Sequence, residues 1–363
     1  DQVLCLMCNA FFGTFEGRDA NKQKRDKNYA FYGYPSINFT SLYIKLKSKQ
    51  YQKVQEYKMK ALITYFDFML HEYPKNKIEN GRISYERRVK RQLPDFYRSS
   101  KRLCHLEIRN VGALEDYREG AMADFANKYI GGGVIGHGCV QEEIQFLIYP
   151  ECIIARLFSK KLLDNEALII RGVHRFSDYS GYGNTFKWEA PNVHLYSYIR
   201  NSDGEAETEI IAIDAVNFSY FKYPDVQYKR KYLEREMHKA YTGFSGLKSA
   251  RLATGNWGCG VFGGDVQLKS LLQWLALSQI NHVYTPRTMV YFAYNKNVIK
   301  EQLPLLVKVL IEQKVTVMDL YRKLLTYLPI KKKHKITVFQ YIANSFSNDE
   351  KSYDLLKPLF PDH

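Results

Sequence analysis

No stretch of the 363-residue chain approaches the roughly 18 consecutive apolar residues that a membrane-spanning helix needs. The chain also lacks internal repeats and low-complexity stretches, so nothing points to a repeat architecture. The first residue is Asp1 rather than Met, so we expect a fragment or a processed form. The absence of a targeting segment therefore says little about the full-length protein.

Cysteine is scarce, with six residues at positions 5, 8, 104, 139, 152 and 259. This scattered spacing fits neither a disulfide framework nor a zinc site. Cys5 and Cys8 form a CxxC among apolar residues, which we interpret as one face of a buried helix. No His, Cys and Asp residues are spaced as metal ligands, so we predict no metal. We expect reduced, intracellular thiols.

Acidic residues are outnumbered, because 53 Lys and Arg stand against 38 Asp and Glu and give a net charge of +15. This excess indicates a polyanionic partner. Solubility alone, or non-specific attraction to nucleic acid, would give the same composition. The basic residues cluster at 22–27, 87–91 and 331–335, which we expect to be loops or solvated faces.

The hydrophobic content of 45% allows a large core, and the length exceeds that of a typical single domain. Residues 1–100 have a mostly helical pattern. Beyond them we expect strands at 103–108, 122–127, 167–173, 186–188, 210–215 and 288–293, and helices at 140–149, 150–160, 228–241, 265–280, 297–313 and 316–327. This alternation predicts an α/β fold with a sheet covered by helices on both faces.

A triple glycine at 131–133 leads through a loop of small residues to two adjacent carboxylates, Glu142 and Glu143, at an expected helix start. Glycine has no Cβ, so backbone N–H groups can approach a bulky anion. The helix N-terminus adds partial positive charge at the same place. Two acidic side chains there would repel a bare phosphate. The pattern therefore favours a ligand with a sugar hydroxyl or glycosidic oxygen beside its phosphates, and glycosidic chemistry on a nucleotide.

A second glycine-rich loop, at 254–265, precedes another expected helix, with Asp265 as its N-cap. Two such loops predict a diphosphate held between them by N–H donors from each. Both loops also spell GxGxxG, which is typical of nicotinamide-dependent oxidoreductases. That reading needs an acidic residue about 20 positions later at the end of a strand. The region at 149–160 has a helical pattern instead, so we disfavour a dehydrogenase.

The two glutamates are expected to have different surroundings. With a helix start near Val140 and about 100° per residue, Val140, Ile144 and Leu147 share one face. Glu143 then lies at the edge of this apolar face, and Glu142 points roughly the other way. Partial desolvation at the edge favours the protonated carboxyl that a general acid needs. The alternative is that both glutamates are ordinary first-turn residues favoured by the helix dipole.

Together these motifs resemble the eukaryotic poly(ADP-ribose) glycohydrolase family, whose signature is a triple glycine followed shortly by Gln-Glu-Glu, here at 141–143. Further similar segments follow the family's order along nearly the whole chain, at 9–15, 124–127, 179–182, 212–215, 239–244 and 254–265. The resemblance implies an α/β macrodomain, a mixed sheet between helices, at 101–363. It also implies a helical accessory region at 1–100.

The resemblance implies hydrolysis of the ribose–ribose O-glycosidic bonds of poly(ADP-ribose), with release of ADP-ribose. Glu143 would protonate the leaving ribose oxygen and then take a proton from the attacking water. Glu142 and Asn127 would hold ribose hydroxyls. The substrate-binding positions that it implies are Gly131, Gly132, Gly133, Gln141, Asn127, Glu115, Tyr182, Asn256, Gly258, Cys259, Gly260, Val261, Phe262 and Phe292.

Four of these positions have a more specific expected role. Tyr182 would lie over the ligand, Phe262 beside the distal ribose, and Glu115 at the adenine amine. Phe292 is a candidate for stacking on adenine, because aromatic rings pair well with bases. A buried strand phenylalanine explains Phe292 equally well. We expect His137, inside the first loop, to be a spacer.

The family uses no metal or cofactor for this reaction, so the resemblance implies none. It implies poly(ADP-ribose) and poly(ADP-ribosyl)ated proteins as partners, a monomer, a nuclear or cytoplasmic location and a role in the DNA damage response. It implies no membrane and no sequence-specific nucleic acid. The alternative is a macrodomain that binds the polymer without cleaving it. Gln141 and Glu143 argue against that, since a binding module has no use for a partly buried acid. Weak removal of mono-ADP-ribose from proteins stays open.

Overall fold

The computed structural model describes residues 1–15, 32–43, 48–71, 81–191, 207–347 and 356–359. The basic cluster at 22–27 lies outside them. Two compact units are present. The first comprises Asp1–Arg87, Asp124–Leu163 and Leu168–Ala212, and the second comprises Arg88–Ala123, Asp164–Ala167 and Ile213–His363. The chain passes between the units several times, and the expected division at residue 100 stays a prediction.

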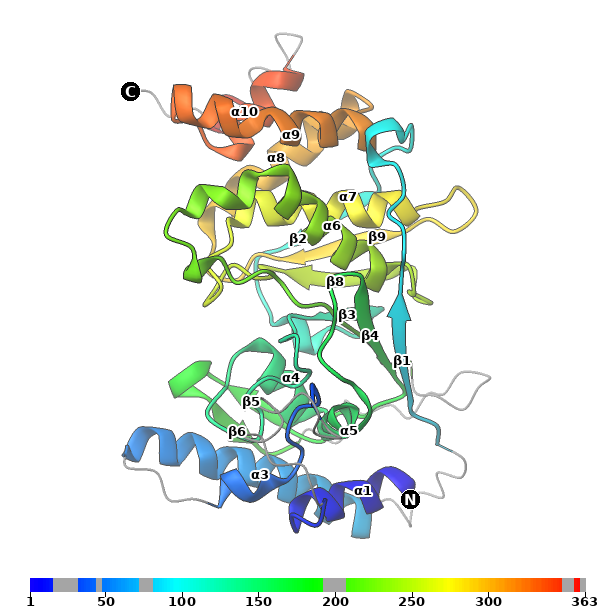
Figure 1. The fold of residues 1–363 in the computed structure, drawn as a ribbon, viewed down its shortest axis with the longest axis vertical. Helices are drawn as coiled ribbons and strands as arrows, with labels where there is room; N and C mark the ends of the chain where they lie inside the picture. Colours follow the sequence, from blue (N-terminus) through cyan, green and yellow to red (C-terminus); the bar gives the residue numbers. More distant parts are fainter. Residues whose placement is uncertain (16–31, 44–47, 72–80, 192–206, 348–355, 360–363) are drawn as a thin grey trace. The chain divides into compact units, whose positions relative to one another are not determined.

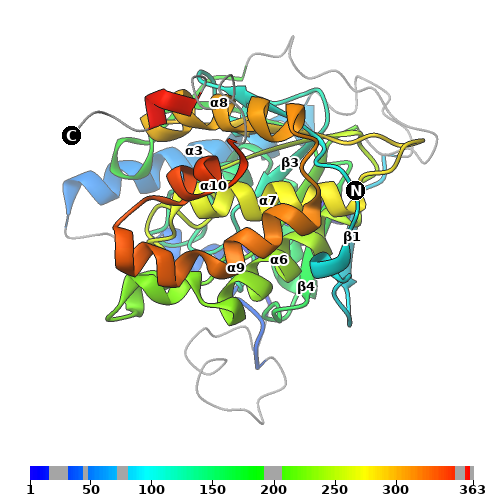
Figure 2. The same cartoon turned by 90° about the horizontal axis from the view of Figure 1, so that it is seen from above.

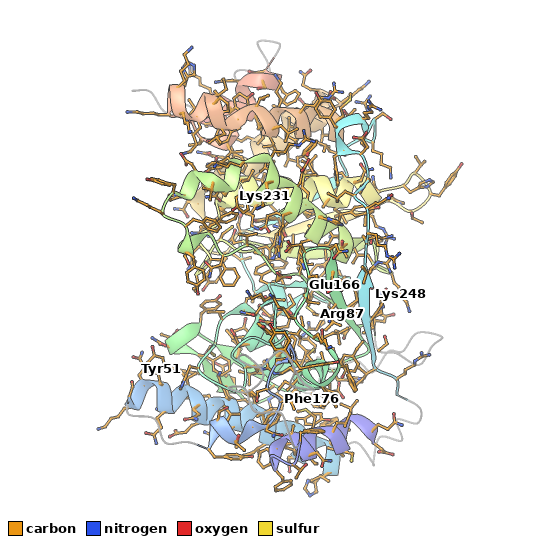
Figure 3. The ribbon with its side chains drawn as sticks, viewed as in Figure 1. Tyr51, Arg87, Glu166, Phe176, Lys231 and Lys248 are labelled. Carbon is orange, nitrogen blue, oxygen red and sulfur yellow. The ribbon has the colours of Figure 1, made fainter. Side chains whose placement is uncertain are left out.

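The N-terminal part of the first unit is helical, with α1 (Gln2–Phe11) and the longer α3 (Lys49–His71) (Figure 1). One stripe of α3 is buried at helical spacing, and it comprises Val54, Gln55, Lys58, Ala61, Leu62, Tyr65 and Met69. Phe176, labelled in Figure 3, packs edge-to-face on Tyr65 at 4.8 Å and Phe68 at 5.4 Å between ring centroids. The helical expectation for this region is confirmed for α1 and α3. The expected burial of the CxxC is wrong at Cys5, which is exposed.

Three strands of the first unit are neighbours in the order β1 (Ser84–Val89), β4 (Glu166–Arg171) and β7 (Glu209–Ala212). β4 and β7 are antiparallel. Arg171 ties all three together, because its guanidinium contacts Glu86 at 3.0 Å and Glu209 at 2.9 Å. β1 interrupts the stretch expected to be helical. It is the first strand in the sheet order, and its half-buried, charged side chains give no alternating apolar pattern.

Among its described residues, the first unit contains two further α-helices and two further strands. They are α4 (Gln141–Ile148), α5 (Ala155–Phe158) and the antiparallel pair β5 (Asp178–Ser180) and β6 (Lys187–Glu189). The expected helix at 150–160 is a 3-10 turn, Pro150–Ile154, followed by the short α5. The expected strand at 186–188 is confirmed as β6.

Four strands of the second unit are neighbours in the order β3 (Ala121–Asp124), β8 (Arg251–Gly255), β9 (Thr288–Phe292) and β2 (His105–Arg109). Each pair of neighbours is parallel. The sheet contains both parallel and antiparallel pairs of strands and is therefore mixed, as expected. The sequence pattern did not indicate β8.

Helices α6 (Arg230–Phe244) and α7 (Val266–Ile280) pack against each other, and α7 links the parallel strands β8 and β9. Figure 2 shows α7 beside α9, and these two helices are in contact. Asp265 is the N-cap of α7, since its carboxylate accepts the N–H of Leu268 at 2.9 Å. The other helices of the unit are α8 (Asn297–Glu312), α9 (Val317–His334) and α10 (Val338–Phe346).

Short 3-10 helices complete the described chain at Phe39–Leu42, Phe96–Arg98, Leu114–Asp116, Gly183–Thr185, Phe218–Tyr220, Pro224–Tyr228 and Lys357–Leu359. Among the helices that the structure describes, none combines the length and the apolar character that crossing a membrane would require.

Candidate functional site

Both glutamates are buried in the first unit, with exposed fractions of 2% for Glu142 and 6% for Glu143. Every residue of α4 is buried. Glu142, expected to point roughly away from the face of Val140, Ile144 and Leu147, is therefore buried as well, and α4 has no solvated face. Burial makes unpaired carboxylates costly, so each needs hydrogen-bond donors.

Backbone N–H groups supply those donors. Glu142 accepts hydrogen bonds from Asn127 at 2.8 Å and Gly131 at 2.6 Å. Glu143 accepts from Gly133 at 2.8 Å and Val140 at 2.9 Å. The contact with Val140 is the half of a capping box that runs from the third helical residue back to the N-cap. The other half is missing, since valine has no side-chain acceptor. The two carboxylates thus tie α4 to the preceding loop.

The glycines are needed because the carboxylates come so close. A Cβ atom on Gly132 would lie 2.5 Å from Glu143 Oε1 and 2.7 Å from Glu142 Oε2, and the φ of Gly132 is +44°. A Cβ on Gly138 would also collide with the Glu143 carboxylate. No side chain other than hydrogen fits between loop and glutamates.

The N–H groups of the triple glycine differ from the expectation that they face a bound anion. Gly131 and Gly133 donate to the two glutamates, and Gly132 donates to the carbonyl of Tyr129 at 3.1 Å. Among the described residues, the first-loop N–H groups without a protein acceptor are those of Ile135, His137 and Cys139. Substrate binding by residues 131–133 stays a prediction.

The pKa of Glu142 is raised well above its ordinary value. Burial is the main cause, and the negative charges of Asp124 and Glu143 add to it. The N–H groups of Asn127 and Gly131 act in the opposite direction. A proton is therefore held on Glu142 at a pH where a solvated glutamate is ionised.

Two buried cations that sequence reasoning missed hold the carbonyl side of the loop. Arg156 of α5, 4% exposed, donates through Nη1 to the carbonyls of Ile130 at 2.7 Å and Gly132 at 3.1 Å. Burial lowers its pKa to about 10, although Glu142 and Glu143 favour the charged form. No motif marks Arg156, because its partners are backbone atoms.

Lys58 of α3, 1% exposed, is the second cation. Its ammonium donates to the carbonyls of Gly133 at 3.2 Å, Val134 at 3.1 Å, Gly136 at 2.8 Å and Gly138. A signal for Lys58 exists in the sequence. It follows Val54 and precedes Leu62 by four residues each, so it is a lysine on the apolar stripe of α3.

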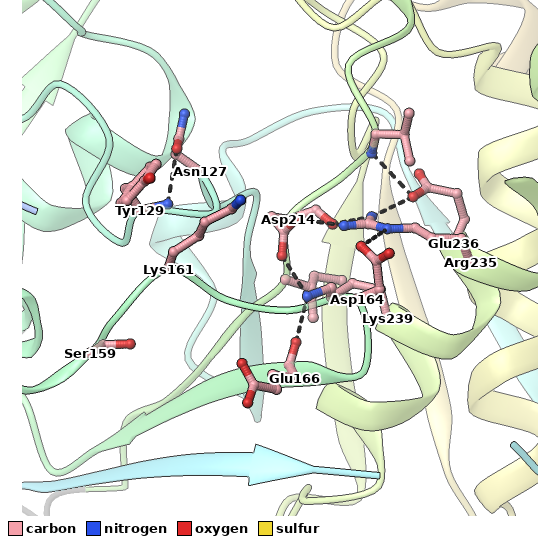
Figure 4. Close-up of polar contacts among 12 residues, drawn as sticks. Asn127, Tyr129, Ser159, Lys161, Asp164, Glu166, Asp214, Arg235, Glu236 and Lys239 are labelled. Carbon is pink, nitrogen blue, oxygen red and sulfur yellow. Dashed lines mark hydrogen bonds and ion pairs between the residues drawn. The ribbon is translucent and has the colours of Figure 1, made fainter. Parts of the chain in front are cut away.

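The other first-unit candidates lie beside the same helix start. The hydroxyl of Tyr182, whose side chain is 43% exposed, accepts the N–H of Gln141 at 3.2 Å. The Gln141 side chain accepts the N–H of Phe125 at 2.7 Å. Asn127 accepts the N–H of Tyr129 at 3.0 Å, a bond drawn in Figure 4. The structure therefore gathers Asn127, the triple glycine, Gln141, both glutamates and Tyr182 around one loop.

The second glycine loop is built on buried side chains of the second unit. Gly258 has a φ of +72°, and a Cβ there would lie 2.6 Å from Ala215 Cβ and 3.1 Å from Lys269 Cε. Lys269 is 1% exposed, forms an ion pair with Glu236, and places its ammonium 3.6 Å from the centre of the Trp257 ring. Burial lowers its pKa well below the ordinary value, and the positive charge of Arg235 adds to this.

A network of buried charges supports this lysine (Figure 4). Arg235 contacts Asp214 and Glu236, each at 2.6 Å, and Lys239 contacts Asp214 at 2.6 Å. Glu236 also accepts the N–H of Val216 at 3.1 Å. The network thereby fixes the segment that follows Asp214, which packs against Gly258.

Donors remain open in this second loop. Within the part of the chain that the structure describes, the N–H groups of Gly258, Gly260, Val261 and Phe262 have no protein acceptor. In contrast, Cys259 donates to Asn256 at 3.0 Å. Val261 is 73% exposed, so the open stretch reaches solvent. These N–H groups can donate hydrogen bonds to a bound anion.

The remaining candidates lie near the end of β9. Asn256 donates to the carbonyl of Ala293 at 3.1 Å, which ties the second loop to the residue after Phe292. Phe292 is 7% exposed, and its ring meets Tyr117 edge-to-face at 6.1 Å. This burial favours a core role, and adenine stacking stays a prediction. Glu115 is 5% exposed in the 3-10 helix Leu114–Asp116, and its contact with adenine also stays a prediction.

The cysteines form no disulfide, and no metal site is found among the residues that the structure describes. All six cysteines are free. Burial is the main cause that raises the pKa of the Cys139 thiol to about 12, which makes it a poor nucleophile. Among the described residues, His, Cys, Asp and Glu nowhere form a group of three or more that could hold a metal ion.

Comparison with known proteins gives two matching family models. The macro domain fold of poly(ADP-ribose) glycohydrolase matches residues 93–301, and the helical domain of the same family matches residues 1–87. The chain is 32% identical over 354 residues to the probable poly(ADP-ribose) glycohydrolase 2 of Arabidopsis thaliana, covering 80% of this chain and 63% of that protein. It is 29% identical over 394 residues to poly(ADP-ribose) glycohydrolase 1 of the same plant, covering 88% and 69%.

A relative from Caenorhabditis elegans, poly(ADP-ribose) glycohydrolase 1, is 36% identical over 235 residues, covering 60% of this chain and 29% of that protein. The chain thus spans less than two thirds of the length of the first plant relative.

Proposed function

Because the chain belongs to the poly(ADP-ribose) glycohydrolase family, we propose that it hydrolyses the ribose–ribose O-glycosidic bonds of poly(ADP-ribose) and releases ADP-ribose. The observation that carries this proposal is the pair of buried carboxylates, Glu142 and Glu143, fixed to a triple-glycine loop. A buried, oriented acid is what proton transfer to a leaving sugar oxygen requires.

Glu143 is the acid and base of the proposed reaction. It donates a proton to the ribose oxygen as the glycosidic bond breaks, and it takes a proton from the water that attacks the oxocarbenium-like carbon. The N–H groups of Gly133 and Val140 hold one carboxylate oxygen each, so the carboxyl group has a fixed direction. Fixed donors also stabilise the carboxylate that forms when the proton leaves.

Glu142 has a different task, because adjacent helix residues cannot flank a bond in the way that the carboxylates of ordinary glycosidases do, about 5 to 9.5 Å apart. We assign Glu142 and Asn127 to the ribose hydroxyls. The raised pKa of Glu142 supports this role, since a protonated carboxyl can both donate and accept a hydrogen bond to a hydroxyl.

The phosphates of the ligand are assigned to open backbone donors. In the second loop these are the N–H groups of Gly258, Gly260, Val261 and Phe262. Successive N–H groups around glycines are a common cradle for phosphate oxygens. The same assignment gives the loop side chains of Asn256 and Phe262 to the ligand's sugar and base. Tyr182, beside the first loop, is also assigned to the ligand. Cys259 is assigned a contact with the ligand through its backbone only.

The partners that follow are poly(ADP-ribose) and poly(ADP-ribosyl)ated proteins, in the nucleus or the cytoplasm, with the chain acting as a monomer. The net charge of +15 supports a polyanionic substrate. We assign no metal and no cofactor to the reaction. The alternative, a macrodomain that binds the polymer without cleaving it, leaves the tightly held Glu143 without a task.

Incubation with poly(ADP-ribosyl)ated protein, followed by chromatography for free ADP-ribose, tests the proposal. We expect ADP-ribose release in the presence of a chelator, and release at least about a hundredfold slower from Glu143→Gln. Polymer that is retained but never cleaved would identify a binding module instead. Activity that is lost in chelator and restored by a divalent ion would contradict the proposed chemistry.

A further inference from the structure

The ammonium of Lys58 donates hydrogen bonds to four carbonyl groups of the first loop, those of Gly133, Val134, Gly136 and Gly138. An ammonium has three N–H donors, so at least one is shared between two carbonyls. Because Lys58 is only 1% exposed, its positive charge interacts with these carbonyl dipoles and not with water. The carbonyls of this loop are therefore turned toward α3.

The direction of the carbonyls fixes the direction of the N–H groups. In a planar trans peptide, C=O and N–H point to opposite sides, and the described chain contains no cis peptide bond. The carbonyls of Val134, Gly136 and Gly138 share peptide units with the N–H groups of Ile135, His137 and Cys139. These three N–H groups point away from Lys58 and, within the described residues, have no protein acceptor.

Arg156 shows what such N–H groups bind in the same loop. Its guanidinium holds the carbonyls of Ile130 and Gly132. The N–H groups of the same two peptide units, on Gly131 and Gly133, donate to the carboxylates of Glu142 and Glu143. A cation on the carbonyl side is thus paired with an acidic side chain on the N–H side. At Lys58 the cation is present and the N–H side is open.

We propose that Lys58 is a positioning residue that aims the N–H groups of Ile135, His137 and Cys139 at a phosphate oxygen of an ADP-ribose unit. The inference deepens the proposed function and rests on it for the identity of the ligand. Lys58 acts through the loop, by orienting and polarising its peptide units. A helix of the N-terminal region thereby takes part in ligand binding.

The charge of Lys58 gives this arrangement a pH dependence. Burial lowers the pKa of Lys58 to about 8, while Cys139 of the loop and Glu143 of α4 favour its charged form. The remaining titratable group of the loop, His137, is exposed and lies against the ring of Tyr51 at 6.4 Å. The charge is complete below that pKa and is lost as the pH rises through it, so the carbonyls lose their cation in alkaline solution.

Calorimetry of ADP-ribose binding to the folded chain tests the inference. We expect Lys58→Met to lower the affinity for ADP-ribose at least about tenfold at pH 7, and to leave the affinity for adenosine, which has no phosphate, unchanged. Lys53→Met is the matched control, because Lys53 is an exposed lysine on the same helix. It should bind ADP-ribose like the wild type.

A second measurement needs no variant. Wild-type affinity should fall as the pH rises from about 7 to 9.5, and binding at about pH 8 should take up protons, because a bound phosphate favours charged Lys58. Lys58→Met should show neither effect. Equal ADP-ribose affinity of Lys58→Met and wild type, or a flat wild-type profile, would overturn the inference.

Polymer cleavage by the wild type shows whether the role of Lys58 or the proposed function has failed. If the wild type cleaves polymer and Lys58→Met binds ADP-ribose normally, only the role of Lys58 fails. If the wild type releases no ADP-ribose from polymer, the proposed function fails, and the pH dependence of ADP-ribose binding still decides the role of Lys58.

Discussion

Arg156 and Glu143 bind opposite edges of a single peptide unit. Arg156 Nη1 donates to the carbonyl of Gly132 at 3.1 Å, and Glu143 Oε1 accepts the N–H of Gly133 at 2.8 Å. The two side chains thus bind opposite sides of the backbone of the triple glycine. Because both side chains are buried, neither can exchange its partner for water without opening the loop.

Replacement of Arg156 should therefore cost stability as well as activity. Arg156→Met leaves the carbonyls of Ile130 and Gly132 without a donor and removes the cation beside two carboxyl groups. We expect the free energy of unfolding to fall by about 3 kcal/mol. Each hydrogen bond to a buried charged group contributes about 1.5–3 kcal/mol, and the contributions of neighbouring bonds are not fully additive. Urea unfolding measures the change.

Arg98→Met is the control for this variant, because the side chain of Arg98 is 84% exposed in a surface ion pair with Asp95. Its unfolding free energy should stay within about 0.5 kcal/mol of wild type. If Arg156→Met matched the control, the loop would not depend on the guanidinium.

Substitution of Glu143 and of Glu142 should have different effects on the kinetics of polymer cleavage. Glu143→Gln keeps the size of the side chain but cannot cycle a proton, so kcat should fall by about 10²–10⁴-fold, while ADP-ribose affinity stays within a few-fold. Glu142→Gln can still accept a hydroxyl bond, so its loss should be smaller or appear in KM as well. Steady-state kinetics on defined polymer give both numbers. A Glu143→Gln enzyme that cleaves at near wild-type rate would move the chemistry to another residue.

Local patterns predicted part of this site well. The N-cap Asp265 and helix α7 depend on residues close in sequence, and both are confirmed. The buried cations Arg156 and Lys58 bind carbonyls, which every residue has. No motif therefore indicates Arg156, and the only signal for Lys58 is its position on the apolar stripe of α3. Likewise, the glycines indicate that some group comes close to the backbone, but not which one. The sequence suggested a phosphate at residues 131–133, and the structure has glutamates there.

The strands also show what the local sequence cannot predict. β4 and β7 were expected because their apolar residues form short continuous runs, which buried strands require. β1 is charged and lies first in the sheet order, and β8 is a short run with two small residues. Their strand conformation comes from pairing with distant neighbours, which the local sequence does not record.

The pKa of Glu142 predicts how stability depends on pH. A carboxyl whose folded pKa is raised stabilises the fold fully below its unfolded value, 4.5, and loses that contribution as the pH rises through the folded value. Glu142→Gln removes this dependence. We expect its Tm, relative to wild type, to shift upward as the pH increases from about 4.5 to 8. Calorimetric scans across this range measure it; a Tm difference that is constant with pH would contradict the assignment.

The last prediction compares two glycines of the second loop. Gly258 has positive φ, and a Cβ there would collide with Ala215 and crowd Lys269, whereas a Cβ on Gly260 would meet nothing within 4 Å. Gly258→Ala should therefore lower the unfolding free energy by about 2–4 kcal/mol, from left-handed strain and overpacking together.

Gly260→Ala should stay within about 0.5 kcal/mol of wild type. Denaturant unfolding separates the two variants, and calorimetry on ADP-ribose tests whether the displaced loop also loses its phosphate donors. We expect Gly258→Ala to bind ADP-ribose more than about tenfold more weakly, because the open N–H groups of Val261 and Phe262 depend on the backbone at Gly258 for their direction. Equal stability of the two variants would mean that the loop moves freely over Ala215 and Lys269, and that these buried side chains do not set its shape.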